Sequence, residues 1–279
     1  MFKIELRKAF HNCFLYSAMC LSIGIAIVSA WFSVHAHQTM ISLIEQYNPE
    51  VYAYVGASLY NSWIGADGSF FTHLFYFLLF LLCTIPYSWS MAKDRECGYI
   101  NQVITRVKRR EYYFAKYVAT FIVGGSISVI PMFVNLLICA SFIPAYRLDR
   151  LSDLYTAVPQ NYMWSSVLYS HPLLYVLLYM LLSFVFTGLW ATVGISIGFF
   201  IKKRLSILIL PFLFMIFVQV ISVNNEWSMK RTIIPSYLIC PRAYGYGDTS
   251  WQVTLVWLGT IIIFNSIIFW IKGRESDVI

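Results

Sequence analysis

The chain carries few charged residues for its length. Asp, Glu, Lys and Arg make up 12% of its 279 residues, whereas a soluble domain usually carries about 25%. A soluble fold of this size would need more charge than this to cover its surface. The hydrophobic residues, 59% of the chain, are gathered in long blocks, which is typical of helices that face lipid. The composition therefore indicates a membrane protein.

Motifs for nucleotide, metal and catalytic chemistry are also absent. The sequence contains no phosphate-binding loop of the form G-x-x-x-x-G-K-S/T and no H-E-x-x-H zinc motif. Cysteine and histidine do not occur in sets with metal-ligand spacing. His35 and His37 are interpreted as solvated loop histidines rather than as a metal pair. We therefore expect no catalytic residue, no resident cofactor and no metal ion in this chain.

Six apolar blocks reach, or nearly reach, the length of a membrane span. A helix needs about 20 residues to cross a hydrocarbon layer roughly 30 Å thick. We predict an all-α membrane protein with six transmembrane helices, in which residues 1–279 form a single transmembrane domain. The predicted spans are residues 13–34, 71–90, 117–145, 172–200, 205–222 and 251–271.

Positive charge is distributed unevenly around these spans. Of the 20 Lys and Arg residues, 15 lie in segments on the side of the two termini, and the other five lie in the opposite loops. Because short loops rich in Lys and Arg stay in the cytoplasm, both termini are predicted to be cytoplasmic. These residues flank apolar blocks and form no run or stripe, so the net charge of +7 indicates contact with membrane lipid and no nucleic-acid partner.

The predicted spans contain no Asp, Glu, Lys or Arg, and His73 is their only histidine. Transporters driven by ions place ionisable groups at membrane depth. A hydrolase needs a nucleophile with a base, or paired carboxylates. The spans therefore argue against ion-coupled transport and against intramembrane catalysis, which leaves an energy source outside this chain.

Two segments outside the spans are predicted to have structure of their own. Residues 1–11 place Phe2, Leu6 and Phe10 at intervals of four, which predicts an interfacial helix on the inner leaflet. Residues 223–250 are too polar to cross the membrane but contain an apolar stretch, which predicts a re-entrant or interfacial outer segment between the fifth and sixth spans.

A third segment, residues 91–116, is the largest predicted cytoplasmic one. Ile100, Val103, Ile104 and Val107 follow helical spacing, so we predict a helix of about three turns with an apolar stripe. Such a helix lies on the membrane or docks into a partner's groove. The spacing alone favours neither alternative.

The residues around this stripe are arranged as in a known family. An acidic residue and a glycine precede it, and a basic residue, an aromatic residue and a lysine follow it. In order, these are Glu96, Gly98, Arg106 or Arg109, Tyr112 or Tyr113, and Lys116. The pattern resembles the loop after the second span of ABC-2 type permeases, the membrane subunits of a class of ATP-binding cassette exporters. The order of an interfacial helix, six spans and a re-entrant outer segment resembles that family over nearly the whole chain, although the outer loop of residues 35–70 is longer than in its smallest members.

The resemblance implies a permease subunit in a bacterial plasma membrane. It would export an amphipathic substrate, with an antimicrobial peptide as the leading candidate. Its implied partners are two copies of an ABC ATPase subunit, which would bind ATP and Mg²⁺, and a second permease subunit, identical or homologous. The implied ATPase-coupling residues are Asp94, Glu96, Gly98, Tyr99, Ile100, Val103, Ile104, Arg106 and Arg109. The alternative from another class is a membrane scaffold, immunity or sensor subunit that transports nothing.

Overall fold

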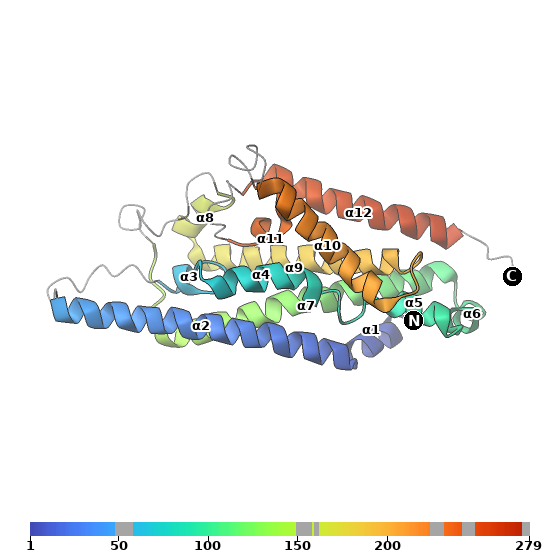
Figure 1. The fold of residues 1–279 in the computed structure, drawn as a ribbon, viewed down its shortest axis with the longest axis horizontal. Helices are drawn as coiled ribbons and strands as arrows, with labels where there is room; N and C mark the ends of the chain where they lie inside the picture. Colours follow the sequence, from blue (N-terminus) through green and yellow to red (C-terminus); the bar gives the residue numbers. More distant parts are fainter. Residues whose placement is uncertain (48–57, 149–157, 159–161, 224–231, 242–248, 275–279) are drawn as a thin grey trace.

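A computed structural model gives the fold and describes residues 1–47, 58–148, 158, 162–223, 232–241 and 249–274. All regular secondary structure within these ranges is helical. The helices are α1 (Phe2–Phe10), α2 (Cys13–Tyr47), α3 (Leu59–Ser62), α4 (Phe70–Leu82), α5 (Ser90–Glu96), α6 (Tyr99–Ile104), α7 (Arg109–Phe142), α8 (Ser165–Ser170), α9 (Pro172–Ile197), α10 (Arg204–Val223), α11 (Pro235–Leu238) and α12 (Trp251–Arg274). They form an elongated bundle whose long helices follow its long axis (Figure 1).

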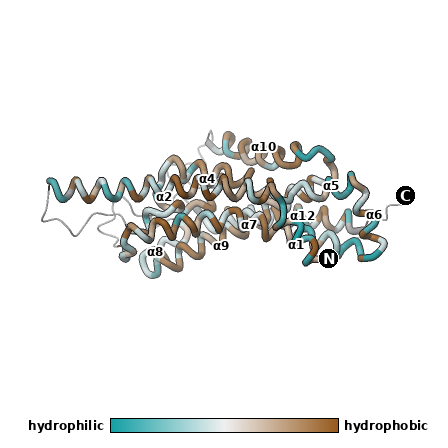
Figure 2. The backbone as a smooth tube through the Cα atoms, turned by 90° about the horizontal axis from the view of Figure 1, so that it is seen from below, coloured by the Kyte–Doolittle hydropathy of each residue, from teal (hydrophilic) through white to brown (hydrophobic). Residues whose placement is uncertain are grey.

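Within the described part of the chain, five helices are long and apolar enough to cross a membrane: α2, α7, α9, α10 and α12. Hydrophobic residues dominate the middle of the bundle, and hydrophilic residues gather at its two ends (Figure 2). This distribution matches a hydrocarbon layer bounded by water on both sides. The chain is therefore a multi-pass helical membrane protein, as the composition predicts.

The second predicted span is not a single helix. α4 has 13 residues, which corresponds to about 20 Å of helix, and turns replace the helix over residues 83–89. The prediction of one helix over residues 71–90 is therefore wrong. Pro86 lies in the interrupted stretch; it has no N–H to donate and disfavours helical backbone at Ile85.

The first predicted span ends too early. α2 has 35 residues, or about 52 Å of helix, and it continues through residues 35–47 of the predicted outer loop. Those residues are polar enough to end an apolar block, yet they include no glycine or proline to end a helix. α7 likewise begins at Arg109, before the predicted start at Tyr117. The observed bounds of α9, α10 and α12 agree with the predicted spans to within three residues.

Helices α7 and α9 pack closely at the centre of the bundle because glycines line their contact. A Cβ atom placed at Gly125 would lie 2.8 Å from the carbonyl oxygen of Phe184, and one at Gly188 would lie 2.7 Å from that of Phe121. Both distances are too short for a real contact, so each backbone occupies the space of a side chain. Small residues let transmembrane helices approach in this way.

The two ends of the bundle differ in the elements that they hold. α1, α5, α6 and the C-terminal end of α12 lie at one end, which we call the N-terminal end; α3, α8 and the C-terminal end of α2 lie at the other, the far end (Figure 1). α11 lies beside α4 and α12. Its flanking residues Ile234 and Ile239 are almost fully buried. Residues 224–231 and 242–248 of the predicted re-entrant segment lie outside the described residues.

Candidate functional site

Charged side chains are buried together at the N-terminal end of the bundle. Lys116 of α7 and Glu5 of α1 are both 0% exposed. The Lys116 Nζ atom lies 3.7 Å from Glu5 Oε2 and donates a hydrogen bond to Asp94 Oδ2 on α5. One lysine therefore joins carboxylates from two other helices. We call this cluster, completed by Lys8, Tyr87 and Tyr112, the ion-pair network.

Two tyrosines complete the hydrogen bonding of the carboxylates. The Tyr87 hydroxyl donates to Glu5 Oε2 at 2.6 Å, and the Tyr112 hydroxyl donates to Asp94 Oδ2 at 2.5 Å. Lys116 also donates to the Tyr112 hydroxyl at 2.8 Å. Removing two carboxylates and an ammonium from water is costly, and such hydrogen bonds are needed to offset the cost. The network is therefore a connected unit rather than an isolated pair.

Helix α1 places Glu5 in this position by turning the face that carries Glu5 and Ala9 towards the protein. Glu5 and Ala9, one helical turn apart, are buried, whereas Phe2 and Phe10 are 42% and 37% exposed. A helix is present at Phe2–Phe10, within the predicted residues 1–11; Phe2 and Phe10 are on the outside, whereas Leu6 is partly buried against the core. The face that carries Glu5 packs against α7.

Lys8 extends the network to α6. Its Nζ atom lies 3.4 Å from Glu5 Oε1 and 3.8 Å from the centre of the Tyr99 ring. Burial alone would lower the pKa of Lys8, but the hydrogen bond with Tyr99 and the negative charges of Glu5 and Asp94 outweigh it and raise the pKa. The ammonium form of Lys8 is thereby favoured.

The predicted three-turn helix is shorter than expected. α6 has six residues and begins after Gly98, whose φ of 67° lies in the left-handed region. The chain must turn from α5 into α6 there and again into α7, which leaves Val107 outside any helix. Ile100 and Val103 are each 6% exposed and pack in one core cluster with Tyr113. Much of the apolar stripe is therefore covered by the chain itself.

The other predicted coupling residues are spread over this region. Glu96 and Arg106 are exposed, and Ile104 and Arg109 are half-buried. Arg95, next to Asp94, donates a hydrogen bond to the carbonyl oxygen of Phe199, just after α9. The structure therefore brings Asp94 and Tyr99 into the ion-pair network and leaves Glu96 and Arg106 on the surface.

Sequence reasoning missed five members of the network as site residues: Glu5, Lys8, Tyr87, Tyr112 and Lys116. Glu5 is the only acidic residue among the first eleven, and Lys116 directly precedes a predicted span. A lone acid in a basic segment and a lysine beside an apolar block are signals of buried pairing. They do not reveal which residues pair, because Glu5 and Lys116 are far apart along the chain.

The site offers positioning rather than metal or bond-breaking chemistry. Among the residues that the structure describes, no group of three or more His, Cys, Asp or Glu side chains could hold a metal ion. The polar atoms of the ion-pair network already serve one another as donors and acceptors. The contacts of the ion-pair network hold α1, α5 and α7 together.

Comparison with known proteins gives no match to a family model, to a curated protein or to a solved structure. The functional interpretation therefore depends on the residues and their geometry.

Proposed function

We propose that this chain is the permease subunit of an ABC exporter, with the ATPase on a separate polypeptide. In this proposal the N-terminal end of the bundle faces the cytoplasm, and the chain crosses a bacterial plasma membrane six times. The second crossing consists of α4, the turns at residues 83–89 and α5. Residues 223–250 form the outer re-entrant segment. Two permease subunits pair, and each contacts one ATPase that binds ATP and Mg²⁺.

The observation that carries the proposal is the ion-pair network. Along the chain, α5 and α6 lie between the longer helices α4 and α7. Asp94 of α5 pairs with Lys116 of α7, and Lys116 in turn pairs with Glu5 of α1. Arg95 ties the same segment to the end of α9. A force applied to α5 and α6 would therefore reach α7 and α9, the central helices of the bundle. A segment that receives a partner's movement needs such a connection.

The face available to a partner is polar. The apolar residues Ile100 and Val103 point into the protein, whereas Glu96, Arg106 and Arg110 are exposed. In this proposal the buried residues hold the shape of α6, and the exposed charges contact the ATPase. The contact would depend on complementary charge, which gives specificity.

The test is to purify the tagged chain together with the ATPase encoded by a neighbouring reading frame. ATP hydrolysis is then measured with a panel of antimicrobial peptides, antibiotics, lipids and polysaccharide fragments. Glu96→Lys should abolish substrate-stimulated hydrolysis while leaving membrane insertion intact, because it reverses a charge at the proposed contact. Glu45→Lys reverses an exposed charge near the far end of α2 and should leave hydrolysis unchanged.

Unchanged hydrolysis in Glu96→Lys would remove this residue from the ATPase contact. If no ATPase co-purifies and no substrate is exported, the scaffold, immunity or sensor role takes the place of the transport role.

A further inference from the structure

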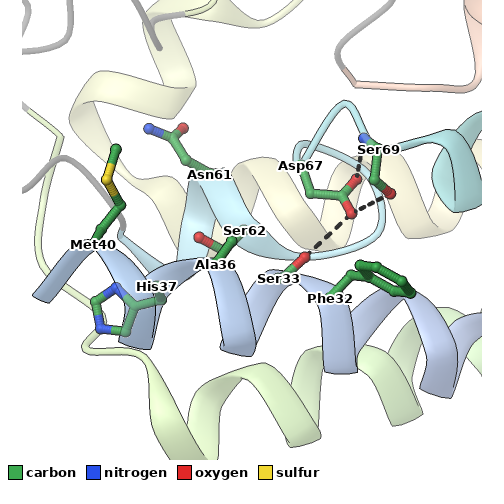
Figure 3. Close-up of a pocket in the computed structure, with 9 residues that line it drawn as sticks. All are labelled: Phe32, Ser33, Ala36, His37, Met40, Asn61, Ser62, Asp67 and Ser69. Carbon is green, nitrogen blue, oxygen red and sulfur yellow. Dashed lines mark hydrogen bonds between the residues drawn. The ribbon is translucent and has the colours of Figure 1, made fainter. Parts of the chain in front are cut away.

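A pocket of about 340 Å³ lies beside the far half of α2. Its wall comes from one face of α2 and from α3 with the loop that follows it (Figure 3). Phe32, Ala36 and Met40 form an apolar side. The polar lining residues are Ser33, His37, Asn61, Ser62, Asp67 and Ser69.

Asp67 places a negative charge at one end of this pocket. Its Oδ2 atom accepts hydrogen bonds from the hydroxyls of Ser29 at 3.1 Å and Ser33 at 3.2 Å, both on α2, and from Ser69 at 2.8 Å. Its Oδ1 atom accepts from the Thr72 hydroxyl. These donors are all neutral, and no Lys or Arg in the described ranges forms an ion pair with Asp67. The hydrogen bonds fix the carboxylate in place without neutralising its charge.

This arrangement brings a charged group against a predicted span that itself contains no acidic or basic residue. Ser29 and Ser33 belong to the first predicted span, so the Asp67 carboxylate reaches the depth of that span from a neighbouring loop. A search for charge within the apolar blocks alone could not find it.

Two further polar groups in the pocket wall have no hydrogen-bond partner among the residues that the structure describes. His37 and Asn61 are each 7% exposed, and neither the Nδ1 atom of His37 nor the Nδ2 atom of Asn61 has a hydrogen-bond partner. Leaving a buried polar atom unpaired is costly, because the atom has lost its hydrogen bonds with water. His37, interpreted from sequence as a solvated loop residue, is therefore a buried member of this wall. Both groups require a partner that the described residues do not supply.

The pocket therefore has two chemically different ends. Ser33 and His37 are one helical turn apart on α2, or about 6 Å along its axis. The carboxylate of Asp67 lies at the Ser33 end, and His37 and Met40 lie towards the far end of the helix (Figure 3). A matching ligand has a positive donor at its tip and a hydrogen-bond acceptor, for the Asn61 amide, a few ångströms behind it.

We propose that this pocket binds the primary amine of a peptide, either a lysine side chain or the amino terminus, that enters from the outer aqueous side. The amine would lie at Asp67, a carbonyl oxygen behind it would accept from Asn61 Nδ2, and an apolar neighbouring side chain would contact Phe32 and Met40. The proposal rests on the orientation in the proposed function, which places the far end outside. It names a cationic, amphipathic peptide as the substrate class.

The direction of the pocket favours a peptide over an aminolipid. In an aminolipid the phosphate lies between the ammonium and the acyl chains, so the ammonium reaches furthest towards water. The pocket has its carboxylate at the deeper end and its unpaired amide and imidazole nearer the far end. In a lipid from the outer leaflet, the ammonium would therefore lie near the amide and imidazole, and the phosphate would lie nearer the carboxylate.

The test measures binding to the chain alone, purified in phosphatidylcholine nanodiscs without any ATPase. The probe is a lysyl-leucine dipeptide with a fluorophore on its carboxyl end, and binding is followed by fluorescence anisotropy. Its twin, with both amines acetylated, should bind at least about tenfold more weakly, because a charge-assisted hydrogen bond is lost. Asp67→Asn should weaken binding of the free-amine probe by a similar factor. Glu45→Gln, which removes an exposed charge from the same helix, should leave it unchanged.

A second variant keeps the test decisive if Asp67→Asn does not fold, as judged by gel filtration and thermal unfolding. Asn61→Leu removes the amide donor with a side chain of similar size and should weaken binding of the free-amine probe several-fold. Equal binding of the acetylated twin, or wild-type affinity in the folded variants, would overturn the proposal.

A separate arm of the experiment tests whether an aminolipid occupies the pocket. If phosphatidylethanolamine in the nanodiscs displaces the probe from the wild-type chain, the occupant is the lipid and the peptide proposal is overturned. Because no ATPase is present, loss of probe binding leaves the coupling role of α5 and α6 untouched. Likewise, a lack of ATPase coupling would not change the interpretation of the probe-binding result.

Discussion

Lys116 is fully buried, and its ammonium is shared between Glu5 and Asp94. Replacing it with methionine keeps most of the length of the side chain but leaves Lys8 as the remaining counter-charge for two carboxylates. We expect Lys116→Met to lower the free energy of unfolding by about 3–5 kcal/mol, the cost of breaking a buried ion pair. Denaturant titration of the purified protein in mixed micelles measures this change.

Two variants separate pairing from a general loss of positive charge. Lys3→Met removes an exposed charge on α1 and should change the free energy of unfolding by less than about 0.5 kcal/mol. Adding Glu5→Gln to Lys116→Met should recover part of the lost stability, because one stranded carboxylate is removed. A double variant that is less stable than Lys116→Met would contradict the proposed pairing.

Gly98 sets the angle between α5 and α6 through its left-handed backbone. A Cβ atom at this position would meet nothing within 4 Å, so any penalty comes from the backbone conformation. We expect Gly98→Ala to lower the free energy of unfolding by about 1–2 kcal/mol. Gly98→Asn should cost less, since asparagine tolerates this conformation. Equal stability of the alanine variant and the wild type in the same titration would contradict this account.

Among the helices, α7 and α9 depend on close contact at their glycines. Gly188→Ala would place a methyl group 2.7 Å from the Phe121 carbonyl oxygen, and backbone atoms cannot move aside as a flexible side chain can. We expect the free energy of unfolding to fall by about 1–3 kcal/mol, as in other overpacked cores. The matched control is Gly24→Ala in α2, where a Cβ atom meets nothing within 4 Å. If both variants lose the same stability, the cause is not the contact between α7 and α9.

The sequence predicts the helical class well because lipid-facing helices require long apolar blocks. The starts of α9 and α12 follow directly from such blocks. The interruption at residues 83–89 is harder to predict, since the apolar character continues through Pro86 while the helix does not. The extension of α2 is missed for the opposite reason: its polar residues end the apolar block but not the helix.

The polar sites are less predictable, because pairing depends on distance in space. Asp94 and Lys116 both belong to the segment of residues 91–116 that the sequence pattern identifies, but their partner Glu5 comes from another part of the chain. Asp67 lies in a predicted outer loop, where an acidic residue is ordinarily solvated. Only the fold brings it against Ser29 and Ser33.

For the whole molecule, the proposed orientation can be tested with the chain's own cysteines. Cys97 is exposed at the N-terminal end of the bundle, and in the proposed topology it lies in the cytoplasm. In a variant that keeps Cys97 and replaces the other five cysteines by serine, a membrane-impermeant maleimide should not label intact cells. It should label the protein after the cells are permeabilised.

The matching probe for the opposite side is a cysteine on the outer part of α2. Gln46 is exposed there, so Gln46→Cys in a background without other cysteines should be labelled in intact cells. Labelling of Cys97 before permeabilisation would reverse the orientation and move the Asp67 pocket to the inner side.

The pairing of Glu5 with Lys116 also has a consequence for biogenesis. Glu5 leaves the ribosome before Lys116, which follows several seconds later at about 5–20 residues per second. During this interval Glu5 has no lysine from α7 to bind, so α1 cannot take its final place. Docking of α1 therefore follows the insertion of α7. A nascent chain that stalls before Arg109 exposes α1 with Glu5 lacking its partner on α7, a feature by which a protease could distinguish it from the finished protein.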